Sequence, residues 1–456
     1  MECFTIMSNE IEGRIDPFYY KPEFRELEKN LSKIKAVPFR EIIKNIINGF
    51  DYRKFTEEGL TYLRVSNIKP FEFDLTDVKK IRPSFEITKK IRLKRGDLLL
   101  TRKGTFGIAL SLDKGEDYII SSEIFKIELS KQINSKFVEI VLNSSICQKQ
   151  FNKYKIGGIM GSLSQEAVKQ IKIPLPPLPI QNRIVQLMDN AYNLKKQKEA
   201  EAKKLLDSIN DYVLSELGIK LPELKDKMTF VVYANDVKGG RLDPYYYQPK
   251  FKEIEKAIEK GKYEVVKFSD IFEKAYINDK KVSKGDKYIL SIDSKKGIIK
   301  EIGIFGSEIY KKTGGTRRQI QHPVYKHYPK SLVISRINIQ RGGCFILDEH
   351  IGPIYSTNEF YSYKSKKASL DFVFFLIRNP IFLKLINKEI SGQFGRFKEA
   401  QFLNLKIPLP PFSIQNKIAE EVKRRMHQAE QLQKEANEVL EKAKQKVEKI
   451  ILGEES

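Results

Sequence analysis

Two long stretches of the chain carry apolar residues at alternating steps of three and four positions. Lys195 and Glu199 fill two seam positions of the first stretch, and Gln433 fills one of the second. The apolar members are Ile184, Met188, Tyr192, Ala202, Leu206, Ile209, Val213 and Leu217, then Ile418, Val422, Met426, Ala429, Ala436, Leu440, Ala443, Val447 and Ile451. A 3.5-residue period sustained for about five heptads predicts coiled-coil helices. Each should end at a capping glycine, Gly218 or Gly453, after ~54 Å.

The chain also contains its own plan twice. GRIDPFYYKPEF at 13–24 returns as GRLDPYYYQPKF at 240–251, with eight of twelve residues identical. IKIPLPPLPIQNR at 171–183 returns as LKIPLPPFSIQNK at 405–417, with nine of thirteen identical. The two separations, 227 and 234 residues, are nearly equal, so the repetition indicates domain duplication rather than a solenoid.

The segments outside the seams predict mixed α/β (α+β) domains. Short β-like runs occur at 97–101, 118–121, 332–335 and 352–355, and amphipathic helices are expected at 135–154 and 370–390. A Pro-rich run precedes each seam and excludes helix or central strand there. We therefore expect two similar globular domains, separated by two long helices that form an antiparallel coiled coil. The divisions are 1–175, 176–220, 221–408 and 409–456.

Composition narrows the function. Lys and Arg number 82 against 59 Asp and Glu, a formal net charge of +23 that suits a polyanion such as nucleic acid or an anionic membrane surface. No apolar run reaches the ~18 residues of a membrane span, and no signal peptide is expected. The three cysteines are isolated, which fits the cytoplasm and gives no disulfide framework. A metal site assembled from His322, His327 and Cys344 has only weak spacing support.

Motifs for catalysis are missing from the sequence. No P-loop occurs, and no G-x-G-x-x-G opens a βα unit. Asp16-Pro17-Phe18-Tyr19 and Asp243-Pro244-Tyr245-Tyr246 are similar to a methyltransferase D-P-P-Y motif but lack the second proline. We interpret them as packing motifs in which Arg14 or Arg241 pairs with the aspartate. The E-x-x-K spacing of Glu123 and Lys126 places the two side chains on opposite faces of a strand. We therefore expect no enzyme activity from this chain alone.

The whole chain resembles the specificity subunit of type I restriction–modification systems. The resemblance is carried by two divergent domains, each ending in I-P-L-P-P-x-x-x-Q, at 173–181 and 407–415, before a long helix. RGDLLLTRKGTFG at 95–107 is similar to a strand–turn of the family's target recognition domains, whereas SRINIQRGGCF at 335–345 departs from its G-T-x-G form.

The resemblance implies a division of labour. Each target recognition domain would read one half of a bipartite, asymmetric sequence in double-stranded DNA, with the helices setting the spacing. The chain would scaffold two methyltransferase subunits, which use S-adenosylmethionine. Through them it would hold restriction subunits that use ATP and magnesium. This chain itself would carry no cofactor or metal and would contact no membrane.

The candidate DNA-binding residues combine basic or amide side chains with nearby glycine. They are Arg102, Lys103, Thr105, Lys155, Gly158 and Ser162 in the first half, and Arg317, Arg318, Gln319, Arg336, Arg341, Arg396 and Lys398 in the second. The segment 314–322 could instead be a solvated loop, and Arg102 and Arg336 could instead form strand-end salt bridges. No aromatic residue is singled out for base stacking.

Four residues repeated at the helix starts are candidates for methyltransferase contact: Gln181, Asn182, Gln415 and Asn416. The alternative is that they cap the helices. For the chain as a whole, the alternative function is a structural coiled-coil adaptor that binds anionic surfaces without sequence preference.

Overall fold

The computed structural model describes residues 4–7, 11, 16–130, 133–157, 161–237, 241–279, 283–304, 324–390 and 396–455. The chain forms two compact units, 1–199 with 433–456, and 200–432. In the sequence, the second unit is therefore inserted between the two segments that make up the first unit. Both units contain helices and strands, so the predicted mixed α+β fold is confirmed.

The elements of the first unit precede α6 in the sequence. They are η2 (Pro17–Tyr20), α1 (Pro22–Leu31), β1 (Ala36–Pro38), η3 (Phe39–Glu41), β2 (Ile43–Asn48), β3 (Leu60–Leu63), η4 (Val65–Asn67), β4 (Ile68–Lys69), β5 (Glu72–Phe73), β6 (Lys79–Ile81), α2 (Phe85–Ile91), β7 (Leu98–Thr101), β8 (Ala109–Ser111), β9 (Tyr118–Ile120), β10 (Ile124–Leu129), α3 (Ser135–Asn143), α4 (Ser145–Tyr154), α5 (Gln165–Gln170) and β11 (Lys172–Pro174).

In the sequence, the remaining elements of the second unit follow the long helix α6 (Leu178–Glu216) and precede the long helix α13 (Phe412–Ile451). They are η5 (Ala234–Asp236), α7 (Pro249–Glu259), β12 (Val265–Lys267), α8 (Phe268–Ile271), β13 (Phe272–Lys274), β14 (Tyr276–Asn278), β15 (Lys287–Asp293), β16 (Ile298–Ile304), β17 (Val324–His327), β18 (Ser331–Ser335), η6 (Ile339–Arg341), β19 (Cys344–Leu347), η7 (Glu349–Ile351), β20 (Ile354–Thr357), β21 (Phe360–Ser365), α10 (Leu370–Arg378), α11 (Pro380–Glu389), α12 (Glu399–Leu403) and β22 (Lys406–Pro408).

The duplication reaches the topology of the sheets. Four strands are ordered β2-β10-β7-β8 in the first unit and β13-β21-β18-β19 in the second. A two-stranded pair, β1-β11 or β12-β22, accompanies each of these sheets. The remaining sheets differ. The first unit adds a three-stranded sheet, β6-β3-β9, and a two-stranded sheet, β4-β5, whereas the second adds one five-stranded sheet, β14-β17-β20-β15-β16.

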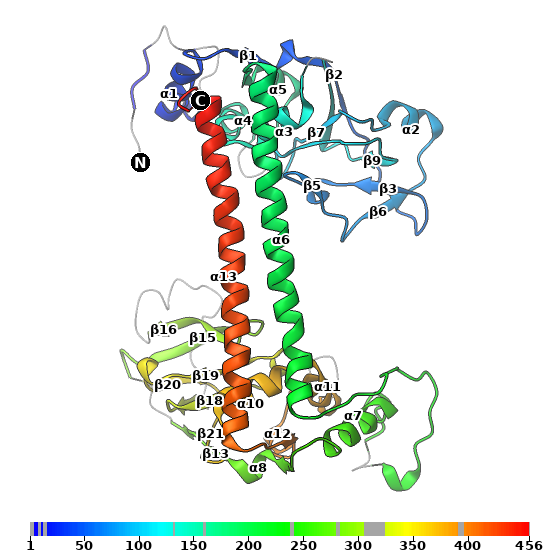
Figure 1. Ribbon diagram of the computed structural model, residues 1–456, viewed down its shortest axis with the longest axis vertical. Helices are drawn as coiled ribbons and strands as arrows, with labels where there is room; N and C mark the ends of the chain where they lie inside the picture. Colours follow the sequence, from blue (N-terminus) through cyan, green and yellow to red (C-terminus); the bar gives the residue numbers. More distant parts are fainter. Residues whose placement is uncertain are drawn as a thin grey trace. The chain divides into compact units, whose positions relative to one another are not determined.

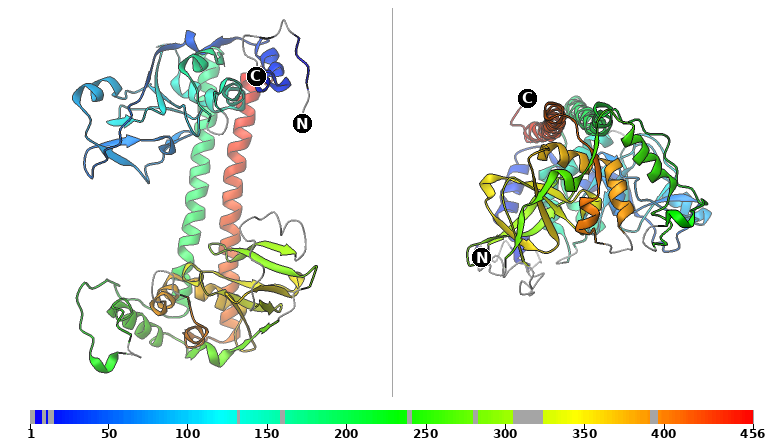
Figure 2. Two further views of the ribbon diagram at one scale, coloured as in Figure 1. Left: turned by 180° about the vertical axis from the view of Figure 1, so that it is seen from behind. Right: turned by 90° about the horizontal axis from the view of Figure 1, so that it is seen from below.

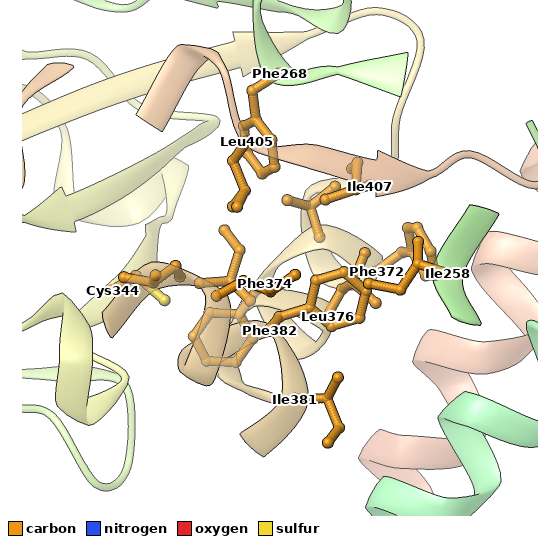
Figure 3. Close-up of a cluster of buried hydrophobic side chains, with 14 of the residues drawn as sticks. Ile258, Phe268, Cys344, Phe372, Phe374, Leu376, Ile381, Phe382, Leu405 and Ile407 are labelled. Carbon is orange, nitrogen blue, oxygen red and sulfur yellow. The ribbon is translucent and has the colours of Figure 1, made fainter. Parts of the chain in front are cut away.

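Each unit has its own hydrophobic core beside the shared four-stranded sheet. In the first unit, Phe125 of β10 packs in one cluster with Phe137 of α3. In the second unit, Phe372 of α10 and Phe382 of α11 cluster with Ile407 of β22, as Figure 3 shows. These five side chains have no exposed surface.

The two predicted helices at 135–154 and 370–390 are each broken into two, a correction to the sequence interpretation. Ser144 separates α3 from α4, and Asn379 separates α10 from α11, both with extended ψ angles of 160° and 134°. Pro380 explains the second break, because a residue before proline is driven out of the helical region. Ser144 breaks the first pair at the matching position without a proline.

The long helices α6 and α13 contain 39 and 40 residues, are unbroken in Figure 1 and Figure 2, and confirm the predicted helical stretches. Gly218, with φ +69°, follows α6, and Gly453, with φ +74°, follows α13, as predicted for left-handed caps. Most seam residues are buried, but Leu206 and Met426 are each 38% exposed.

Within each unit, the part of α6 present packs antiparallel to the part of α13 present. In the first unit Ile184 and Met188 share a core cluster with Val447, and Lys198 pairs with Glu435 at 2.7 Å. In the second unit the Arg425 side chain donates to Ser208 Oγ at 2.9 Å, and the Lys417 ammonium lies 3.1 Å from Glu216. Apolar seams and charged flanks thus hold the helix segments together in each unit.

Candidate nucleic-acid interface

In the first unit, a tight glycine-bearing turn joins β7 to β8. Gly104 and Gly107 have φ of +69° and +84°, and the Thr101 hydroxyl accepts a hydrogen bond from the Ile108 amide at 2.9 Å. A Cβ at Gly107 would lie 2.9 Å from the Phe151 ring, so the turn requires glycine there. The turn leaves the side chains of Lys103 and Thr105, both predicted for DNA contact, exposed.

A second segment, between α4 and α5, lies beside this turn. Ser162 forms β-bridges with both Lys103 and Ile156, and the Leu163 amide donates to the Arg102 carbonyl at 2.8 Å. The Lys155 ammonium lies 4.7 Å from the ring centre of Phe18. The structure therefore brings together Arg102, Lys103 and Ser162, with Lys155 one residue from the bridge. Gly158 lies outside the described residues.

Arg102 is held at the end of β7 by its own backbone and by an aromatic ring. Its amide donates to the Glu123 carbonyl at 2.8 Å, and its guanidinium lies 5.0 Å from the centre of the Phe125 ring. Nε is buried without a hydrogen-bond partner. Among the described residues, no carboxylate forms a salt bridge with Arg102, so the strand-end salt bridge considered for it is not seen.

The second unit repeats this arrangement at Arg336, after β18. The Arg336 amide donates to the Glu359 carbonyl at 2.8 Å, and its carbonyl accepts from the Phe397 amide at 3.0 Å. The guanidinium lies 5.2 Å from the centre of the Tyr361 ring, and Nη1 donates to the Asn358 carbonyl at 3.2 Å. Its Nε is buried without a partner, as in Arg102.

Other predicted residues of the second unit surround this strand end. Arg396 pairs with Glu359 at 2.8 Å and is largely exposed. Lys398 is exposed just before α12, and Arg341 is exposed at the end of η6, before Gly342 with φ +79°. Arg317, Arg318 and Gln319 lie outside the described residues, so their predicted role stays a prediction.

The residues predicted for partner contact divide into two kinds. Gln181 and Gln415 are buried, and their amides donate to the carbonyls of Pro176 at 2.9 Å and Pro410 at 2.7 Å. The Gln415 oxygen also accepts from the Ser369 amide at 2.7 Å. These two side chains thus brace the Pro-rich runs and present no surface to a partner. Asn182 and Asn416, one residue further on, are exposed.

The residues considered for metal binding or catalysis have structural partners. Burial lowers the pKa of His327 to about 3, and its ring nitrogens lie 2.9 Å and 2.7 Å from the hydroxyls of Ser362 and Ser356. His322 lies outside the described residues. Within the described ranges, no three His, Cys, Asp or Glu side chains gather as metal ligands. Lys126 forms a salt bridge with Asp97 at 3.2 Å.

The repeated D-P motif is a turn-forming and packing device, as predicted. Asp16 accepts from the Phe18 amide and Asp243 from the Tyr245 amide, both at 3.0 Å. The Arg241 guanidinium also pairs with Asp243 at 3.0 Å. Arg14 lies outside the described residues.

Sequence reasoning missed a group of tyrosines beside Arg336. Tyr276, Tyr325 and Tyr361 come from three different strands, and their ring centres lie 4.8 to 6.3 Å apart. Their spacing along the chain gives no warning, because only strand pairing brings them together.

The chain matches known proteins along much of its length. Residues 59–204 match the sequence model of the type I restriction modification DNA specificity domain. Over 387 residues the chain is 26% identical to the type I restriction enzyme MjaVIII specificity subunit of Methanocaldococcus jannaschii, covering 80% of each protein. Over 206 residues it is 23% identical to the type I restriction enzyme EcoKI specificity subunit of Escherichia coli (strain K12), covering 43% of this chain and 44% of that protein.

A solved chain from the type I restriction–modification system, determined in work on complex assembly and conformational transition, has the same fold. Its TM-score is 0.53 at 13% identity, and the match covers 92% of this chain and 96% of that one. The domain match and the similarity to curated specificity subunits confirm the resemblance to type I restriction–modification specificity subunits seen in the sequence.

None of the helices in the described ranges combines the length and apolar character that crossing a membrane requires.

Proposed function

We propose that this chain reads a bipartite, asymmetric sequence in double-stranded DNA, with one half-site for each unit. The single observation that carries the proposal is the recurrence of one arginine arrangement in both units. Arg102 and Arg336 bond backbone groups at corresponding positions of the repeat, lie over an aromatic ring at the matching position, and stand beside exposed cations. A recognition device present twice suits a target with two parts.

The likeness of the two arginines suggests which part of DNA they contact. The half-sites of an asymmetric target differ in sequence but share a phosphate backbone, which positions a protein without specifying bases. We therefore assign Arg102 and Arg336 to phosphates. Base reading would come from residues that differ between the units: Lys103, Thr105, Lys155, Gly158 and Ser162 in one, and Arg317, Arg318, Gln319, Arg341, Arg396 and Lys398 in the other.

A repeated exposed surface at the helix starts supports the scaffold role. Leu178 of α6 and Phe412 of α13 occupy the same repeat position and are 49% and 48% exposed. Exposed Asn182 and Asn416 follow one turn later in each helix. Two like surfaces fit two copies of one partner, which we assign to two methyltransferase subunits. S-adenosylmethionine would then bind those subunits, and ATP and magnesium the restriction subunits that they hold, in the cytoplasm.

Selection from random duplex DNA tests the proposal, using the full chain with its methyltransferase partner. We expect a split consensus with a fixed spacer between its halves. Binding without sequence preference, retained on other polyanions, would contradict the proposal and favour the structural adaptor instead. Methyl transfer by the chain alone would contradict its non-catalytic role.

We further propose that α6 and α13 set the spacer. The pairs Lys198–Glu435 and Ser208–Arg425 share one register, so deleting 200–206 together with 427–433 keeps both pairs in phase. Each deletion shortens its helix by ~10.5 Å and rotates the residues after it about the helix axis by only ~20°. The selected spacer should shorten by about three base pairs at 3.4 Å each. Deleting 200–206 alone is the control that disrupts the register. An unchanged spacer after the paired deletion would exclude this role.

A further inference from the structure

Three tyrosines of the second unit form one half-buried aromatic group, defined here as the tyrosine cluster: Tyr276 of β14, Tyr325 of β17 and Tyr361 of β21. The ring of Tyr276 lies 4.8 Å from Tyr325 and 5.5 Å from Tyr361, and Tyr325 lies 6.3 Å from Tyr361. The interplanar angles are 30° and 28° for the two pairs that include Tyr361, which are stacked, and 37° for Tyr276 and Tyr325, which are tilted. Three strands thus bring their aromatic rings together.

Two cations and one carboxylate contact the tyrosine cluster. The Arg336 guanidinium lies 5.2 Å from the Tyr361 ring centre, and the Lys274 ammonium lies 5.8 Å from that of Tyr276. The Tyr276 hydroxyl donates to Glu399 at 2.8 Å. Within the described part of the chain, the Tyr325 hydroxyl has no hydrogen-bond partner. Charged side chains therefore hold Tyr276 and Tyr361 in place, whereas the hydroxyl of Tyr325 forms no hydrogen bond with a described residue.

The tyrosine cluster belongs to the second unit alone. Strand pairing places Tyr361 opposite Ile334 as it places Phe125 opposite Leu100, so Phe125 is the counterpart and is fully buried. In the first unit, Asn48 and Gln165 occupy the positions that Tyr276 and Glu399 occupy in the second. The Asn48–Gln165 hydrogen bond of 3.0 Å therefore corresponds to the Tyr276–Glu399 hydrogen bond. Tyr325 lies on β17, one of the two strands that the five-stranded sheet has beyond β20-β15-β16, the part that matches β9-β3-β6 in order and strand direction.

The tyrosine cluster lies at the edge of a buried aromatic group, Phe268, Tyr363 and Phe402, in which the first two rings lie 4.5 and 5.0 Å from that of Phe402. Tyr276 joins the two groups, with its ring 6.4 Å from that of Tyr363. All three members of the buried group are at most 1% exposed, whereas the tyrosine cluster is only half-buried beside the proposed phosphate contact. Aromatic side chains can make apolar contact with base edges in duplex DNA, and such a contact neutralises no phosphate and so adds nothing to the salt dependence of binding.

Building on the proposed function, we propose that the tyrosine cluster packs its rings against a nucleobase of the second half-site and determines specificity there. Arg336 would position the DNA backbone beside the rings. The first unit, with Asn48 and buried Phe125 at the matching positions, would read its half-site without such a contact. The two units would then differ in the chemistry of recognition as well as in sequence.

The test compares Tyr325→Ala and Tyr325→Phe in the full chain with its methyltransferase partner. The probes are the duplex selected by the wild type and two versions with one half-site replaced by unrelated sequence. Tyr233→Ala, at a tyrosine 72% exposed in the same unit and outside the cluster, is the matched control. Thermal melting checks that each variant folds.

We expect Tyr325→Ala to bind the selected duplex about tenfold more weakly, with an unchanged dependence on salt concentration. The loss should vanish when the second half-site is replaced and persist when the first is replaced. Tyr325→Phe, which keeps the ring, and Tyr233→Ala should stay within about twofold of the wild type.

Two outcomes overturn the inference while leaving the bipartite function intact. One is a split wild-type consensus with Tyr325→Ala unchanged, or weakened equally for all three duplexes. The other is an equal loss for Tyr325→Phe and Tyr325→Ala, which would assign the contact to the hydroxyl. A wild type that selects no split consensus would overturn the proposed function and this inference together.

Discussion

The two units share one scaffold and differ in what they add to it. Both build a four-stranded sheet in the same order, cover it with a broken helix pair and end its central strand at an arginine. The first unit adds a three-stranded and a two-stranded sheet, and the second adds one five-stranded sheet. The four-stranded sheet and the arginine at its strand end are common to both units, whereas the arrangement of the added strands differs. Duplication thus retained the central sheet while the strands around it diverged.

The same contrast appears between α3 and α10, the matching helices of the two units. Phe137 of α3 and Phe372 of α10 occupy matching positions and are both fully buried. Two residues further on, Glu139 stands in α3 where α10 has Phe374. Glu139 bonds the Ser111 hydroxyl at 2.5 Å, and burial raises its pKa to about 7. The scaffold therefore accepts a buried carboxyl in one unit and an aromatic ring in the other.

The largest expected effect tests whether the shared positions are equivalent. Phe137→Ala and Phe372→Ala should each lower the free energy of unfolding of their own unit by about 3–5 kcal/mol, because each leaves a cavity in a dry core. Hydrogen exchange of peptides from each unit, followed by mass spectrometry, measures the two losses separately. Phe85→Ala, at a phenylalanine 80% exposed, is the control. Unequal losses would show that the two cores have diverged in importance.

A pH titration tests the position where the helices differ. The folded pKa of Glu139, about 7, lies above the unfolded value of 4.5, so the native state holds a proton over this range. Stability from this group should be complete below about pH 4.5 and be lost as pH rises through 7, by about 3 kcal/mol. Glu139→Gln should remove this dependence in the first unit. A pH response that survives in Glu139→Gln would assign it to another group.

The second unit should respond to pH in the opposite direction. The pKa of His327 is lowered by burial to about 3, below the 6.5 of an unfolded histidine. Its contribution is present above pH 6.5 and is lost as pH falls, by about 2 kcal/mol at pH 5. Hydrogen exchange of β17 at pH 5 and 7 measures it, and His327→Gln should flatten the profile. Acid destabilisation that is equal in both units would contradict the contrast.

Binding measurements test the arginines that the units share. Arg102→Gln and Arg336→Gln should each weaken DNA binding about tenfold at 0.15 M salt and reduce the salt dependence by about one counterion. The selected consensus should not change, because a phosphate contact carries no base information. A consensus altered at one half-site would show that the arginine there reads a base.

The sequence was sufficient for features with a local or repeated signal. The apolar seams, with Gly218 and Gly453 after them, predicted the long helices, and the two repeated motifs predicted the duplication. The break at Asn379 had a signal in Pro380, whereas the matching break at Ser144 had only the repeat itself. The contact of Lys103 with Ser162 and the meeting of Tyr276, Tyr325 and Tyr361 depend on pairing between distant segments. Local patterns do not encode such pairing.

The smallest expected effect concerns how the matching helices begin. Asn134 caps α3 by accepting hydrogen bonds from the amides of Lys136 and Phe137, at 3.0 and 3.4 Å. Ser369, at the matching start of α10, makes no side-chain cap, and its amide donates to Gln415 instead. Asn134→Ala should therefore cost about 1 kcal/mol in hydrogen exchange of α3, and Ser369→Ala only a few tenths in α10.

Asn134→Ser separates the cap from the other bond of this residue, since Asn134 also donates to Asn182 at 3.0 Å. Serine can cap a helix but does not reach as far, so it should restore most of the loss if capping is the cause. If Asn134→Ser is as weak as Asn134→Ala, the bond to α6 carries the effect. The helix start in the first unit would then be stabilised through α6, as Gln415 of α13 already holds Ser369 in the second.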